Sequence, residues 1–135
     1  MLFRSDGPLL DGCLVEQGAV IENSVIGLRC RIGRNVVIRN SVVLGTDFYE
    51  SPEDLAAAAA QGIPPLGIGE GTIIEGAIVD KNVRIGRRAR IVNDHGLQDL
   101  ADSDRFTVRD GIAVVPKDAV VPDGWLPEPG LVHDQ

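Results

Sequence analysis

The amino-acid sequence predicts an all-β fold, a parallel β-helix of six-residue repeats with one short helical excursion and a C-terminal hairpin. An aliphatic residue recurs every six positions at Leu14, Val20, Ile26, Ile32, Ile38 and Leu44. A smaller residue follows four positions after each of the first five, at Gly18, Ser24, Cys30, Val36 and Val42. A six-residue period fits neither an amphipathic helix nor a two-faced sheet, so it indicates short strands winding into a prism.

The same pattern returns downstream. Ile73, Val79, Ile85 and Ile91 take the aliphatic position, and Ala77, Val83 and Ala89 take the small one. Residues 20–32 and 73–85 align without a gap. If about three hexads complete one coil, residues 14–45 make about two coils, stacked at the usual inter-strand spacing of ~4.8 Å.

The boundaries follow from where the period stops. We expect an irregular lead-in over 1–13, a β-helix domain over 14–125 and a tail over 126–135. Residues 46–66 leave the period as an excursion with a helix-start signal: Ser51 as N-cap, Pro52 first, and acidic residues in the first turn. Gly62 ends this helix.

A second interruption spans residues 93–114, a polar loop followed by a hairpin. FTVRDGIAVV predicts two strands that turn at Asp110-Gly111, because Asp-Gly is a strong hairpin signal. Val115, Ala119 and Val121 then restore the hexad phase.

Composition excludes several classes of protein. The formal charge of −7 argues against a broad nucleic-acid surface. No apolar run approaches membrane-spanning length, so we expect no membrane partner. Cys13 and Cys30 lack metal-ligand spacing, and Cys30 occupies a small inward position, which favours a buried free thiol over a disulfide.

No catalytic constellation is visible. His95 and His133 lie in irregular segments without a nucleophile at suggestive spacing. We interpret His95 as a surface loop residue, with an acid–base role as the second interpretation.

The basic residues of the C-terminal half offer a candidate anion site. Lys81 and Lys117, the two lysines of the chain, each lie two positions after an inward valine and share one outward phase. The arginines near them in the sequence are Arg84, Arg87, Arg88, Arg90, Arg105 and Arg109. An ammonium group suits a phosphate, and guanidinium groups add bidentate contacts. Spacing alone nevertheless favours ordinary surface charges that balance neighbouring aspartates.

Particular motifs carry a family resemblance. PPLGIGEGTIIEGAIVDKNVRIG, preceded by VVLGTDFYE and followed by DGIAVVPKDAVVPDG, resembles the C-terminal domain of ADP-glucose pyrophosphorylase (glucose-1-phosphate adenylyltransferase). The resemblance runs from about Asp11 to Gly124 and is nearest to the plant and cyanobacterial branch. It implies a left-handed parallel β-helix. The tail DGWLPEPGLVHDQ departs from the family, which usually continues with another aliphatic strand.

The resemblance implies a regulatory and assembly role. The family makes ADP-glucose and pyrophosphate from ATP and glucose 1-phosphate, for starch or glycogen synthesis, on an N-terminal nucleotidyltransferase domain with Mg²⁺. Nothing in this chain matches that domain, so enzymatic activity of the chain itself stays open and no cofactor is expected in it. The implied assembly is a homo- or hetero-tetramer in the plastid stroma, or in the cytoplasm of a bacterium or cyanobacterium.

The resemblance also gives the lysines a ligand. Lys81 stands in IVDKN and Lys117 in VPKDA, the motifs whose lysines contact the activator 3-phosphoglycerate, which inorganic phosphate opposes as inhibitor. Arg84, Arg87, Arg88 and Arg105 are possible helpers that no motif carries over. Two alternatives remain: a hexapeptide-repeat acyltransferase with a histidine base, and a purely structural oligomerisation β-helix.

Overall fold

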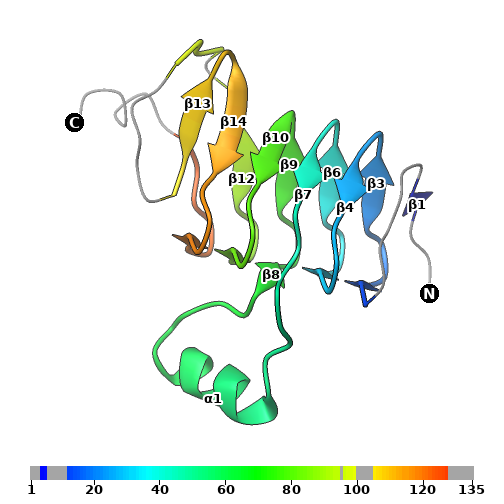
Figure 1. The fold of residues 1–135 in the computed structure, drawn as a ribbon, viewed down its shortest axis with the longest axis vertical. Helices are drawn as coiled ribbons and strands as arrows, with labels where there is room; N and C mark the ends of the chain where they lie inside the picture. Colours follow the sequence, from blue (N-terminus) through cyan, green and yellow to red (C-terminus); the bar gives the residue numbers. More distant parts are fainter. Residues whose placement is uncertain (1–3, 6–11, 95, 100–104, 128–135) are drawn as a thin grey trace.

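The computed structural model describes residues 4–5, 12–94, 96–99 and 105–127. The chain winds into a prism with three faces, each a five-stranded sheet (Figure 1). Face A, in the order β1-β3-β6-β9-β12, contains Arg4–Ser5, Val20–Glu22, Val37–Arg39, Ile73–Glu75 and Arg90–Val92. Face B, in the order β13-β14-β10-β7-β4, contains Thr107–Arg109, Ile112–Val115, Ala77–Val79, Val42–Val43 and Val25–Ile26. Face C, in the order β15-β11-β8-β5-β2, contains Val120–Val121, Arg84–Ile85, Gly67–Ile68, Arg31–Ile32 and Leu14–Val15.

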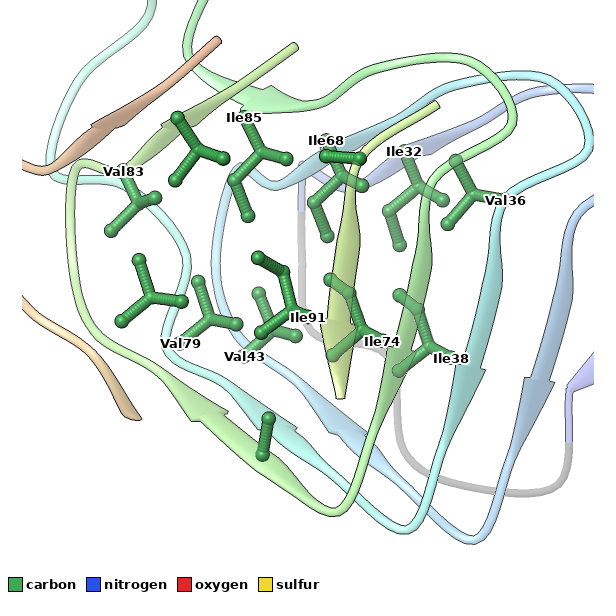
Figure 2. Packing of buried hydrophobic residues seen from close by; sticks show 14 of the residues in the cluster. Ile32, Val36, Ile38, Val43, Ile68, Ile74, Val79, Val83, Ile85 and Ile91 are labelled. Atoms are coloured by element: carbon green, nitrogen blue, oxygen red, sulfur yellow. The ribbon is translucent and has the colours of Figure 1, made fainter. Parts of the chain in front are cut away.

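Apart from β13, the strands stack in parallel, which confirms the predicted coil. Val20, Val37 and Ile73 pair in succession on face A, as the alignment of 20–32 with 73–85 requires. Inside the prism, each inward aliphatic side chain packs on its equivalent in the next coil, as Ile32, Ile68 and Ile85 do (Figure 2). Because each coil buries its inner side chains against its neighbours, the core forms only by stacking.

The predicted phase is wrong at four aliphatic positions. Leu14 and Leu44 are 55% and 40% exposed, and Val15 and Val43 are buried in their place. Likewise, Val20 and Ile73 are half-buried on the outer side of face A, where Ile21 and Ile74 point inward. The small positions shift in the same way: Gly18 is exposed and Val42 is half-buried, whereas Ala19 and Ser41 are buried.

The physical reason is the length of the coil. Register partners in neighbouring coils are 17 residues apart, as Val20 and Val37 are, so a coil is one residue shorter than three hexads. The corner between faces A and B turns on one residue with positive φ: Asn23 at 49°, Asn40 at 52° and Gly76 at 61°. Asparagine and glycine tolerate this left-handed conformation, which makes so short a corner possible.

The two interruptions have the predicted local structure. Helix α1, Pro52–Ala60, starts at N-cap Ser51 and has a reciprocal capping box with Asp54, and Gly62 follows with φ 72°. None of its residues is buried, and Figure 1 shows it standing away from the prism between β7 and β8. Strands β13 and β14 pair antiparallel around Asp110-Gly111, which confirms the hairpin.

The ends of the chain differ from the prediction in one respect. Residues 4–5 of the expected irregular lead-in form β1, which pairs in parallel with β3. At the other end, the Trp125 ring lies 5.4 Å from the buried Phe106 ring and closes the last coil. The tail from residue 128 onward lies outside the described residues.

Candidate anion site at the corner between faces B and C

Lys81 and Lys117 lie in consecutive coils at the corner between faces B and C. They follow β10 and β14, whose residues Val79 and Val115 are register partners. The backbone N–H of Asp118 donates to the Lys81 carbonyl at 3.0 Å, which fixes the two lysines one coil apart. Both residues are exposed. The predicted shared outward phase is therefore confirmed, with the two Cα positions about 4.8 Å apart along the stack.

Asp47 is the third charged group at this corner. Its Oδ1 lies 3.4 Å from Lys81 Nζ. The Asn82 side chain holds Asp47 twice: Nδ2 donates to Asp47 Oδ2 at 3.0 Å, and Oδ1 accepts from the Asp47 N–H at 2.9 Å. These contacts lower the pKa of Asp47, chiefly through the Asn82 hydrogen bond, then through Lys81, with longer-range attraction from Lys117. The corner thus pairs Asp47 with Lys81 and places Lys117 one coil further along the stack.

Asp47 is a site residue that the sequence alone did not indicate. It is the first residue of the DFYE motif, so it opens the excursion, and its contact with Lys81 crosses from one coil to the next. The DFYE motif indicated the resemblance to ADP-glucose pyrophosphorylase, but nothing in it indicated that Asp47 faces the lysines.

Arg84, the first expected helper, has a structural contact instead. Its Nη1 lies 2.8 Å from Glu50 Oε2 and 3.0 Å from the Pro64 carbonyl, and the Glu50 side chain is only 6% exposed. Glu50 Oε1 also accepts from the Leu66 N–H at 2.7 Å. This arrangement ties the start and the end of the excursion to face C, so the Arg84 guanidinium is already engaged.

Arg87 and Arg88 lie elsewhere, at the corner between faces C and A. Both are exposed, and the Arg87 N–H donates to Asp123 Oδ1 at 2.8 Å. Arg87 lines a groove of about 540 Å³ between the excursion and face C, together with Arg31, Arg34 and several carboxylates. Strand β11 of face C lies between Lys81 and these two arginines, so the structure does not bring the two helpers to the lysine corner.

Arg105, the remaining helper, precedes β13 at the end of the stack. Its Nε donates to the Val120 carbonyl at 3.1 Å, on the strand that follows Lys117. This contact places the Arg105 side chain against β15 of face C, with its guanidinium bonded to the backbone.

Other candidate chemistry is sparse in the described part of the chain. Both cysteines are free thiols; burial raises the pKa of Cys30 to about 12, with a smaller contribution from Cys13. The prediction of a buried free thiol at Cys30 is confirmed. His95 and His133 lie outside the described residues.

The described residues were also compared with the requirements of a metal site and of a membrane-spanning helix. Within the described ranges no group of three or more His, Cys, Asp or Glu residues is placed to hold a metal ion. In the same ranges no helix has the length and apolar character needed to cross a bilayer.

Parallel strands in three faces, inward aliphatic stacks and corners of positive φ define a hexapeptide-repeat β-helix. A family model described as the GLGC left-handed parallel β-helix domain matches residues 6–126. The chain belongs to this family, which is that of the C-terminal β-helix domain of ADP-glucose pyrophosphorylase. The match agrees with the resemblance seen in the sequence and establishes the left hand of the coil.

Proposed function

We propose that the chain is the regulatory and assembly part of a glucose-1-phosphate adenylyltransferase, and that its lysine corner binds a phosphorylated effector. The observation that carries this proposal is the stacking of Lys81 on Lys117 in consecutive coils of a chain with net charge −7. The expected ligands are a sugar-acid phosphate such as 3-phosphoglycerate, as activator, and inorganic phosphate, as inhibitor.

The corner suits a compact anion. Two ammonium groups that start from positions ~4.8 Å apart can converge on one phosphate group, each donating to different oxygens. Lysines bind phosphate as point charges, so affinity should fall with salt. Because the chain carries a net charge of −7, the positive charge that attracts an anion is confined to this corner.

On this proposal the effector acts by shifting a conformational population. The transfer of the adenylyl group from ATP to glucose 1-phosphate takes place on a nucleotidyltransferase domain, where Mg²⁺ is expected to act. An effector that binds more tightly when that domain is active favours the active state by its difference in affinity. The β-helix supplies the binding energy and performs no chemical step.

An outward apolar column supports the assembly role. On face B, Val25, Val42 and Ile78 are register partners on the outer surface. Val25 and Ile78 are 41% and 37% exposed, and Ile112 beside them is 44% exposed. We take this strip as the candidate contact surface of the proposed tetramer.

The test is effector binding to the full chain by calorimetry, using 3-phosphoglycerate and inorganic phosphate. Lys81→Ala and Lys117→Ala should each weaken binding by roughly tenfold, because each removes a charge in direct contact with the phosphate. Arg34→Ala removes the same charge at the corner between faces C and A and should change affinity by less than about twofold.

In an enzyme that includes the catalytic domain, both lysine variants should lose activation while basal turnover stays intact. Equal losses in the lysine variants and in Arg34→Ala would contradict the site. Tetramer formation without effector binding would favour the structural alternative, and acetyl transfer from coenzyme A would favour the acyltransferase.

A further inference from the structure

The lysine corner already holds an anion of its own. Asp47 presents Oδ1 to Lys81 at 3.4 Å, and Lys117 lies one coil further along the same corner. The Lys81 and Asp47 side chains are 50% and 48% exposed, so both can move away into water. The second pair of the excursion, Arg84 with Glu50, is 23% and 6% exposed and has no such freedom.

We propose that Asp47 is a tethered counter-anion of the lysine pair, which an incoming ligand must displace and which thereby sets the ligand class. This proposal rests on the proposed anion site. Asp47 forms with Lys81 the same kind of ion pair that a free carboxylate would form. Because Asp47 is tethered, its effective concentration is in the millimolar range, as for short tethers in general. A free carboxylate at lower concentration therefore gains little by replacing it. A phosphate dianion carries twice the charge and more acceptor oxygens, so it can compete.

The geometry makes this exchange possible without loss of the fold. An exposed ion pair contributes little to stability, so it separates easily. The backbone N–H and the second oxygen of Asp47 remain bonded to Asn82, which holds the start of the excursion in place when Lys81 turns to the ligand. The Asp47 carboxylate then stays beside the bound anion and lowers the affinity for that anion by charge repulsion.

Asp47→Asn tests the proposal because it removes the charge and keeps the shape and the hydrogen-bonding capacity toward Asn82. The probes are inorganic phosphate and acetate, titrated onto the full chain at low salt and followed by ³¹P and ¹³C NMR. We expect phosphate affinity to rise about fivefold and acetate affinity by a larger factor, so that discrimination between them falls. In about 0.5 M salt the gain should largely vanish.

The matched control is Glu53→Gln, which makes the same charge change in the same excursion, on α1. Equal phosphate affinities in Asp47→Asn and Glu53→Gln would overturn the proposal that Asp47 is a counter-anion. In that case the proposed lysine site would still stand if Lys117→Ala abolishes phosphate binding. Phosphate binding that is unaffected by Lys117→Ala would overturn both proposals. An Asp47→Asn chain with an unchanged unfolding midpoint ensures that any change in affinity is local.

Discussion

The two interruptions of the β-helix add the same number of residues between neighbouring coils, but one is polar and exposed and the other is apolar and buried. Across each, register partners in neighbouring coils are 36 residues apart, as Val37 and Ile73 are across the first and Arg84 and Val120 across the second. The first, residues 46–66, leaves the prism as a helix with no buried residue, held by polar and charged contacts. The second returns as β13, buries Phe106 and Val108, and covers the end of the core.

This difference separates two uses of an insertion. An apolar insertion at an open end removes core surface from water and contributes directly to global stability. A polar insertion at a corner contributes little to the core, and it can position groups such as Asp47 beside a ligand site. Stability changes should therefore concentrate in the second interruption and local or binding changes in the first.

The largest effect should come from Phe106→Ala. The ring is 1% exposed and contacts Trp125, so its removal leaves a cavity under the cap and should cost about 3–5 kcal/mol of unfolding free energy. Leu55→Ala on α1, where the side chain is 39% exposed, should cost less than about 0.5 kcal/mol. Urea unfolding measures both, and similar losses would remove the contrast.

A smaller, local effect is expected from Glu50→Gln. The change leaves the Arg84 guanidinium, 23% exposed, without its counter-charge, at a cost of about 1–3 kcal/mol to the attachment of the excursion. Limited proteolysis within 52–65 should accelerate by roughly tenfold, while the unfolding midpoint of the prism changes little. Glu75→Gln, an exposed carboxylate on face A, serves as control, and a matching acceleration there would point to a general charge effect.

The smallest effect is a pH dependence confined to α1. Hydrogen bonds from the backbone and then the side chain of Ser51 lower the pKa of Asp54 below its ordinary value of 3.8. The stabilisation is therefore complete above pH 3.8 and is lost as the pH falls through the lower pKa of the folded state. Amide protection in residues 55–61 should drop as the pH falls below about 4, and Asp54→Asn should remove that drop. Loss of protection throughout the prism over the same range would show that α1 is not independent.

Much of the fold could be predicted because its signals are local. The recurring aliphatic residues, the Ser51 cap with Pro52, and the Asp110-Gly111 turn each depend on a few neighbouring residues. The inward phase could not be obtained from a strict period, since it depends on a one-residue corner. The spacing of Asn23 and Asn40, one coil apart, was the signal that could have shown it.

Fewer residues of the candidate anion site could be predicted from the sequence. Lys81 and Lys117 could be placed on one corner because their phase was right. Arg87 lies close to Lys81 in the sequence but at another corner, because a few residues carry the chain across a whole face. Asp47 lies far away in the sequence and yet contacts Lys81, because coil stacking and the course of the excursion bring the two together.

The 17-residue coil also sets the steps in which such a chain can grow or shrink. Deleting or duplicating one whole coil returns every later strand to its old face, with its old side chains inward. A change of any other length within the regular part rotates all that follows, and isoleucines that were inside then face water. Gene duplication can therefore lengthen this domain in whole units, whereas the two corners that carry the interruptions accept extra sequence because the chain re-enters the ladder in register.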